Sequence, residues 1–415
     1  MNKIQLILFG IAAGTCAWLG GAGNATAAPC PGWGCGANAA TVGDGIVFDE
    51  LNVNGQAGPS GMQLINPRLA NHAPVTLRVT GHKLTAIDTA NPAMTYVGPQ
   101  LEGMTFAVRH NDGRAYEIKV AKVHERCEKK VPSDRCLQFW VLPNDAVPYY
   151  DFLVRKIHRR TGAAPGSANR RGDDRPIESG PGEKLCKGEF LEQGPLWTGI
   201  QNSAIVFEGD HYDVPRKRVT PPAGNGWFNL ACAGGVMAKM HLLRHTKAGS
   251  VTLSGPPRQT TLGQRTAMLK MLTADYCGDG TAWTADGTPL QYMVKGWYPT
   301  QALNLDALAQ AGQIEAVWEP NGPLCLNAPR RRPTVPAVAG CTPPGVTRAE
   351  VQARCPARFA TPTNAGVTAP DSVIARCNAA WWAAHKNDSG LHVVSAYSLT
   401  PGQYCDSPPV TAGPN

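Results

Sequence analysis

Thr273-Ala274-Asp275-Tyr276-Cys277-Gly278-Asp279-Gly280 joins the end of a predicted helix to a turn. The helix is expected over residues 262–273, because Leu262, Met268, Leu269 and Leu272 fall largely on one face. We expect it to stop near Tyr276, where Gly278 and Gly280 permit the backbone to turn. The cysteine of the stretch would tie this stop to another part of the chain. The stretch therefore predicts a helix end that is fixed covalently.

The carboxylates of this stretch have a structural and a metal-binding interpretation. Asp275 and Asp279 can accept hydrogen bonds from backbone amides at the helix end, which is an ordinary task for short carboxylates. Together with Asp286 they could instead supply oxygen ligands to Ca²⁺, although their spacing does not match an EF-hand loop. The structural interpretation is preferred, and neither a metal nor a cofactor is predicted.

A cysteine nucleophile and a zinc site are two further chemistries to weigh. Cys277 could act as a nucleophile with a histidine as its base, but an even set of cysteines in an oxidising compartment favours pairing. The candidate bases are His211, His241 and His245. The last two lie four residues apart on a predicted helix and could face one Zn²⁺. The metalloprotease glutamate is absent, because Leu242 follows His241.

The chain begins with the features of a secretory signal peptide, predicted over residues 1–27. A positive charge at Lys3 precedes an apolar run, and small residues end in Ala25-Thr26-Ala27. We therefore expect cleavage after this triplet and export to the periplasm or beyond the cell. No second apolar run is long enough to span a membrane. An alternative interpretation makes Cys16 a lipid-anchored first residue.

Cysteine usage agrees with export. Thirteen cysteines occur, and Cys16 alone lies in the predicted signal peptide. The others form an even set, which predicts paired disulfides in an exported chain. These disulfide candidates are Cys30, Cys35, Cys127, Cys136, Cys186, Cys232, Cys277, Cys325, Cys341, Cys355, Cys377 and Cys405.

The net charge of +8 is modest for 415 residues. It favours weak attraction to anionic lipid headgroups or acidic polysaccharide; another envelope protein is a further candidate partner. Residues 155–187 contain several arginines and few apolar side chains, which predicts a mobile basic loop. No aromatic residues are interleaved with these arginines, so nucleic-acid binding is not predicted.

The predicted fold class is α+β, with a β-rich N-terminal part that runs into a mixed domain. Residues 28–94 have the pattern of short strands. Residues 95–327 add a hairpin that turns at Asn111-Asp112-Gly113, a helix over residues 235–245, and a late hairpin that turns at Pro320-Asn321-Gly322.

A linker and a small C-terminal module complete the predicted organisation. The linker over residues 328–340 is rich in arginine and proline. Residues 341–415 are expected to form a separate helical module stapled by its own four cysteines, in one of three pairings. One helix should begin at Arg348, and a later one should carry Trp381 and Trp382. These tryptophans are expected in the core, with stacking on sugar rings as the alternative.

Several segments of the chain resemble the ADYC domain family, which is named for its Ala-Asp-Tyr-Cys tetrapeptide and occurs in exported bacterial proteins. Besides residues 274–277, the segments 228–232, 286–288 and 315–322 are similar to that family and follow its order. The resemblance covers about residues 96–326. It implies a fold and a compartment but no reaction, because the family has no assigned activity.

The sequence thus predicts a disulfide-stabilised cell-envelope protein with a non-catalytic binding or structural role. The candidate binding residues are Asp275, Asp279, Asp286, His241 and His245. The alternative is a hydrolase of envelope polymers, with a site around Asp275, Asp279 and His241. No Gly-x-Ser-x-Gly elbow, phosphate-binding glycine loop or dinucleotide fingerprint supports other enzyme classes. Buried aspartates beside a Cys277 disulfide would favour the structural role, whereas an open cleft of carboxylates and histidines would favour the enzyme.

Overall fold

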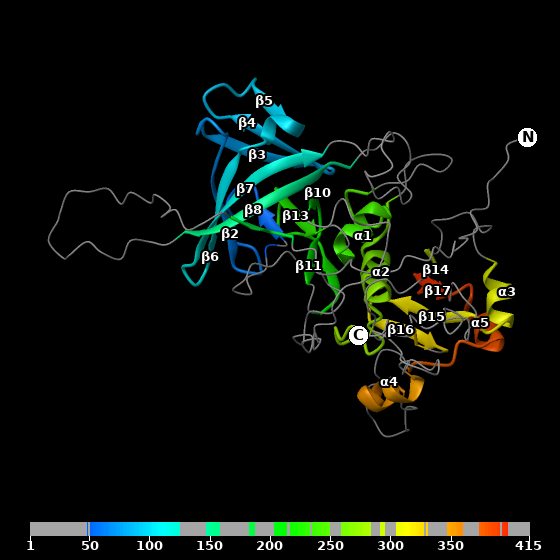
Figure 1. The fold of residues 1–415 in the computed structure, drawn as a ribbon. Helices are drawn as coiled ribbons and strands as arrows, with labels where there is room; N and C mark the ends of the chain where they lie inside the picture. Colours follow the sequence, from blue (N-terminus) through cyan, green and yellow to red (C-terminus); the bar gives the residue numbers. More distant parts are fainter. Residues whose placement is uncertain are drawn as a thin grey trace, which may run out of the picture.

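The computed structural model describes residues 48, 50–124, 147–157, 182–186, 203–213, 216–232, 235–249, 259–283, 291–294, 304–327, 329–330, 347–359, 373–390 and 392–396. Within these residues the fold is β-rich with a few short helices, in line with the predicted mixture of strands and helices. Figure 1 shows a large sheet and a small sheet, with two helices between them.

The large sheet is antiparallel along its whole path. Its strand order is β1 (Glu50–Asn52), β13 (Trp227–Cys232), β10 (Ala204–Glu208), β8 (Tyr149–Ile157), β7 (Ala115–His124), β6 (Thr105–His110) and β2 (Met62–Arg68). A short strand, β9 (Glu183–Lys184), pairs with β8. The hairpin predicted around Asn111-Asp112-Gly113 is confirmed as β6–β7, with Gly113 at a φ of 92°.

Strand β10 is buried on both faces and so separates two cores. Ala204 and Val206 face one hydrophobic cluster, whereas Ile205 and Phe207 face another. Alternation is expected, because successive side chains of a strand point to opposite faces. A strand covered on both faces has a continuous apolar sequence, which explains the run from Ala204 to Phe207.

A three-stranded sheet contributes side chains to the hydrophobic cluster that contains Ala204 and Val206. It consists of β3 (Val75–Thr80), β4 (Lys83–Asp88) and β5 (Thr95–Val97), followed by the 3₁₀ turn η1 (Gly98–Leu101). Its buried side chains include Leu77 and Leu84. The Leu84 N–H also donates to the Tyr150 hydroxyl of the large sheet, at 3.2 Å. This hydrogen bond joins the two sheets in addition to the apolar packing between them.

The helices α1 (Val236–Leu242) and α2 (Leu262–Thr273) occupy the opposite side, together with the hairpin β11 (His211–Asp213)–β12 (Arg218–Thr220). The limits predicted for α2 are confirmed, and Thr261 caps its first turn by accepting from the Gln264 N–H at 3.1 Å. Helix α1 is shorter than the predicted 235–245. Arg244 has a left-handed φ of 67°, and this conformation ends the helix.

The small sheet has the strand order β14-β17-β15-β16. These strands are β14 (Gln291–Val294), β17 (Val393–Ala396), β15 (Ile314–Glu319) and β16 (Gly322–Leu326), and the predicted late hairpin is confirmed as β15–β16. One face packs against α2 and the other against α3 (Leu305–Gln310) and α5 (Ala379–His385). In Figure 1 the red β17 lies beside the yellow β15, although they are far apart in the sequence.

The prediction of a separate C-terminal module is wrong for the described residues. Strand β17 lies inside the small sheet. Cys355, at the end of α4 (Arg348–Arg354), is followed by the 3₁₀ turn η2 (Pro356–Arg358) and pairs with Cys277. Cys377 pairs with Cys325. Pairing of the C-terminal cysteines among themselves is therefore contradicted for Cys355 and Cys377.

The predicted linker and the predicted basic loop each include residues that the structure places within the fold. Arg330, at the start of the predicted linker 328–340, is 4% exposed. Residues 155–157 belong to β8, and Cys186, near the end of the predicted loop, is buried in a disulfide with Cys232. An arginine-rich composition marks a lack of apolar side chains, but it does not show whether an individual arginine finds a buried partner.

Several predictions lie outside the described residues. They concern the signal peptide 1–27, Cys16, Cys30, Cys35, Cys127, Cys136, Asp286, Cys341 and Cys405. In the part of the chain that the structure describes, no helix has the length and apolar character needed to cross a membrane.

Candidate functional site

The segment Ala274–Gly280, called the ADYC turn below, begins with a left-handed residue. Ala274 has a φ of 53°, and the N–H groups of Ala274 and Asp275 donate to the carbonyl oxygens of Met271 and Lys270, at 3.1 and 2.9 Å. These two bonds form a Schellman motif, which usually has glycine at the left-handed position. Here the alanine methyl group is fully buried in the core. Helix α2 therefore ends at Thr273, as its predicted range has it, and the reversal of the chain begins at Ala274 rather than near Tyr276.

Asp275 forms a buried ion pair with Lys270. The Nζ–Oδ2 distance is 2.7 Å, and the two side chains are 0% and 3% exposed. The Lys270 ammonium also donates to the carbonyl oxygens of Arg216 and Gly278, at 3.3 and 3.1 Å. Asp275 Oδ2 accepts the Gly280 N–H at 3.0 Å. Burial raises the pKa of Asp275, and Lys270 and this N–H oppose the rise.

Tyr276 belongs to a second buried polar group. Its hydroxyl donates to Glu315 Oε1 at 2.5 Å and accepts the Arg330 backbone N–H at 2.7 Å. The Arg330 guanidinium donates to both carboxylate oxygens of Glu315, at 2.9 and 3.1 Å. Burial and the neighbouring Glu315 charge raise the pKa of Tyr276 well above its ordinary value. The phenol is therefore a buried hydrogen-bonding group held between Glu315 and the Arg330 backbone.

Cys277 forms a disulfide with Cys355. A free thiolate is required for nucleophilic catalysis, so this pairing contradicts the nucleophile hypothesis. The adjoining Gly278 approaches the β15–β16 turn so closely that a Cβ atom there would lie 2.1 Å from the Asn321 carbonyl oxygen. Only glycine fits this contact, and its φ of 74° also favours glycine.

Asp279 is the more exposed of the two aspartates in the turn. Its Oδ1 atom accepts the Thr281 N–H at 2.9 Å, and its side chain, 42% exposed, lies 3.7 Å from Arg354 of α4. Both aspartates thus accept backbone amides as the structural interpretation predicts. Binding of a ligand by Asp275 or Asp279 stays a prediction. Among the described residues, no three metal-ligating side chains are grouped as a metal ion would require.

Each residue of the Ala-Asp-Tyr-Cys tetrapeptide therefore has a specific internal partner or conformation. The sequence model of the ADYC domain family matches residues 98–332 of the chain. The chain belongs to the ADYC domain family. The match runs past the limit expected from the sequence and includes Arg330, which binds Tyr276 of the ADYC turn. It ends before α4, α5 and β17. No curated protein and no solved structure matches the chain.

His241 and His245 do not have the geometry that the zinc interpretation assumed. Helix α1 ends at Leu242, so His245 lies beyond the helix, and its N–H donates to the Met240 carbonyl at 2.7 Å. The His241 ring stacks on Phe207 with centroids 4.5 Å apart. The two rings therefore do not lie on one face of a helix, because the left-handed Arg244 separates them.

Both histidines are fully buried and have polar neighbours. His241 Nδ1 lies 2.9 Å from the Thr246 hydroxyl, and His245 Nε2 lies 3.3 Å from the Tyr292 hydroxyl. Burial lowers the pKa of His241 well below its ordinary value and lowers the pKa of His245 to about 3. Both rings are thus neutral at physiological pH, and neither acts as an accessible proton carrier.

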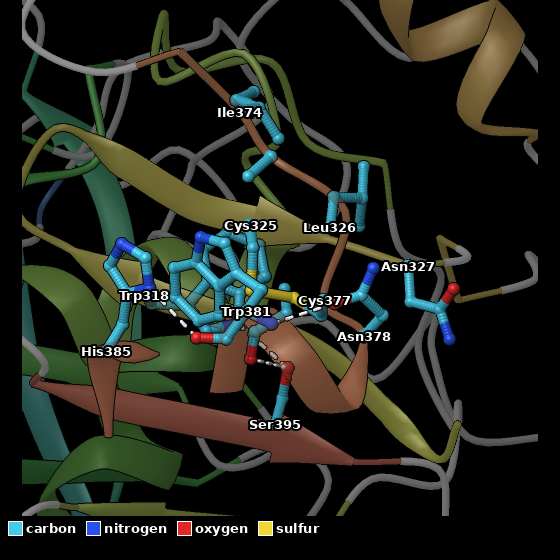
Figure 2. Close-up of a disulfide and its surroundings, with 12 residues drawn as sticks. Trp318, Cys325, Leu326, Asn327, Ile374, Cys377, Asn378, Trp381, His385 and Ser395 are labelled. Carbon is cyan, nitrogen blue, oxygen red and sulfur yellow. Dashed lines mark hydrogen bonds between the residues drawn. A yellow bond between two sulfur atoms is a disulfide. The ribbon is translucent and has the colours of Figure 1, made fainter. Parts of the chain in front are cut away.

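Trp382 confirms the core prediction, and Trp381 is half-buried. The Trp382 indole N–H donates to Asp306 at 2.7 Å, and its side chain belongs to the cluster around Cys325–Cys377. Trp381 stacks on His385, with ring centroids 4.5 Å apart. Figure 2 shows this pair next to the disulfide. Sugar binding by Trp381 stays a prediction.

Sequence reasoning missed the buried charged groups. Lys217 is 1% exposed, and its burial lowers its pKa to about 8. Arg265 of α2 pairs with Asp210 at 2.6 Å, and His211 pairs with Glu50 of β1. Lys270 offered a usable signal, because it lies between two buried apolar residues on a helix that packs on both sides. A charge at such a position requires a partner.

We predict a large difference between the two ion pairs of the ADYC turn. Lys270→Met should lower the free energy of unfolding by about 3–5 kcal/mol, because it leaves the Asp275 carboxylate buried without its cation. Arg354→Ala, which removes the exposed partner of Asp279, should cost less than about 1 kcal/mol. Chemical denaturation of both variants measures the difference. Adding Asp275→Asn to Lys270→Met should restore part of the loss; a further additive loss would contradict the ion-pair account.

We also predict acid sensitivity from His245. Its pKa is about 3 in the folded protein and about 6.5 in an unfolded chain. The unfolded state therefore binds more protons between these values, and the free energy of unfolding falls as the pH drops from 6.5 towards 3. His245→Gln should reduce this slope by up to about 1.4 kcal/mol per pH unit, as measured by denaturation at several pH values. His72→Gln, at an exposed position, is the control; equal slopes in both variants would contradict the prediction.

Proposed function

We propose that this ADYC-domain protein is exported to the cell envelope and has a non-catalytic binding or structural role. The observation that carries the proposal is that the polar side chains and the cysteine of the ADYC tetrapeptide already bind partners inside the protein. Asp275 binds Lys270, Tyr276 binds Glu315, and Cys277 is in a disulfide. Side chains whose functional atoms are buried in internal contacts are poorly placed to bind a substrate.

Disulfide bonding supports the proposed compartment. Within the described residues, the pairs are Cys186–Cys232, Cys277–Cys355 and Cys325–Cys377. Such bonds form and persist in oxidising surroundings such as the periplasm or the extracellular medium. The signal-peptide pattern of residues 1–27 favours the same destination, with anchoring at Cys16 as the alternative.

The envelope-polymer hydrolase is the less supported function. A hydrolytic pair would bring Asp275 or Asp279 near His241 around an open site. The described hydrogen bonds instead join Asp275 to the ADYC turn and α2, and they join His241 to Thr246. Both Asp275 and His241 are 0% exposed.

The net charge of the chain suggests the kind of partner. A charge of +8 favours acidic surfaces. We therefore propose anionic polysaccharide, lipid headgroups or an acidic envelope protein as ligands.

The test is peptide mapping of the non-reduced protein, after thiol alkylation, from separated periplasmic, membrane, medium and cytoplasmic fractions. We expect a mature chain that starts at Ala28, with Cys277 linked to Cys355. A chain that stays in the cytoplasm with its amino-terminal segment intact and its thiols alkylated would contradict export. A form lipidated at Cys16 would keep export and replace the soluble form by an anchored one. An alkylated Cys277 in an exported chain would show a free thiol and would favour the hypothesis that Cys277 is a nucleophile.

A further inference from the structure

The small sheet contains a central strand that lies outside the family domain. Strand β17 lies between β14 and β15, whereas the family match ends at residue 332. Without β17, the two strands on either side would face each other across a gap of about 10 Å, twice the usual spacing between neighbouring strands. The position that β17 occupies between β14 and β15 is one strand wide and is called the slot below.

Strand β17 fits this slot through both of its edges. It pairs antiparallel with β14 from Val393 to Ala396, and with β15 over the same residues. Ser395 adds a side-chain contact, because its hydroxyl accepts the Trp318 indole N–H at 2.8 Å and donates to the Ala316 carbonyl at 3.3 Å. Figure 2 shows Ser395 directed toward Trp318.

The strand also fits through both of its faces. All four residues of β17 are buried. Val393 belongs to the cluster that includes α2, and Val394 belongs to the cluster on the side of α3 and α5. A segment with small or β-branched side chains at each position is therefore required to fill the slot without a cavity or a clash.

Two of the disulfides among the described residues connect the family domain to the segment that carries β17. Cys277 and Cys325 lie within the family match, and their partners Cys355 and Cys377 lie beyond it. Another described disulfide, Cys186–Cys232, has both cysteines inside the match. The first two pairs thus report whether a chain is bound to its own C-terminal segment or to another.

We propose that the slot between β14 and β15 is a strand-acceptor site that a second copy of this chain can fill with its own Val393–Ala396, which exchanges together with Cys355 and Cys377 of the same segment. The contacts in such an exchanged dimer are the ones described above, made between chains instead of within one. Exchange of an identical element has a low free-energy cost for this reason. The chain's own β17 occupies the site in the monomer and blocks it. This inference does not depend on the proposed function.

The test uses the full chain in an isotope-mixing experiment. Equal amounts of ¹⁵N-labelled and unlabelled protein are reduced, unfolded, mixed and refolded with oxidation, at a series of concentrations. Disulfide-linked peptides are then identified by mass spectrometry. We expect pairs of mixed label for Cys277–Cys355 and Cys325–Cys377 to increase with concentration, towards about half of all such pairs. These pairs should occur in a species that has the mass of a dimer by light scattering.

The Cys186–Cys232 pair is the internal control and should stay unmixed. Unmixed Cys277–Cys355 pairs at every concentration would overturn the proposal. Mixing of Cys186–Cys232 to the same extent as the other two pairs would also overturn it, because random disulfide exchange would then explain the result. Neither outcome bears on export, so failure here is distinguishable from failure of the proposed function.

Discussion

The Lys270 ammonium group connects three parts of this protein at one buried point. It donates to the Asp275 carboxylate in the ADYC turn, to the Gly278 carbonyl in the same turn, and to the Arg216 carbonyl in the β11–β12 hairpin. Removing a charge from water has a high free-energy cost, and it is tolerated only when other groups replace the lost hydration. The positions of α2, the turn and the hairpin therefore depend on one another, because each supplies an acceptor.

The remaining contacts of the ADYC turn extend outward from this point. Ala274 ends α2, the Tyr276 hydroxyl binds Glu315 of β15, and Cys277 is bonded to Cys355 at the end of α4. Gly278 allows the β15–β16 turn to approach within van der Waals contact. The tetrapeptide that names the family is thus a junction at which the helix layer, the small sheet and the C-terminal segment meet.

Local features of this fold could be predicted from the sequence, whereas long-range partners could not. The limits of α2 and the turns of the β6–β7 and β15–β16 hairpins follow from capping, periodicity and turn residues, which act over a few positions. Strand β17 was missed because its pairing with β14 and β15 is set by packing between segments far apart in the chain. His241 and His245 were misplaced for a local reason, since a left-handed arginine is an uncommon helix end. The roles of Asp275 and Asp279 as backbone acceptors could be predicted, but the buried lysine partner could not.

Amide hydrogen exchange at the ADYC turn is the most direct test of its role as a structural junction. The N–H groups of Asp275, Gly280 and Arg330 donate to Lys270, Asp275 and Tyr276, respectively. If the turn is a junction, these amides exchange only through global unfolding, with the same free energy as the amides of the buried strand β10. Faster exchange of these three amides, while β10 stays protected, would show that the turn opens independently of the core and would contradict the account.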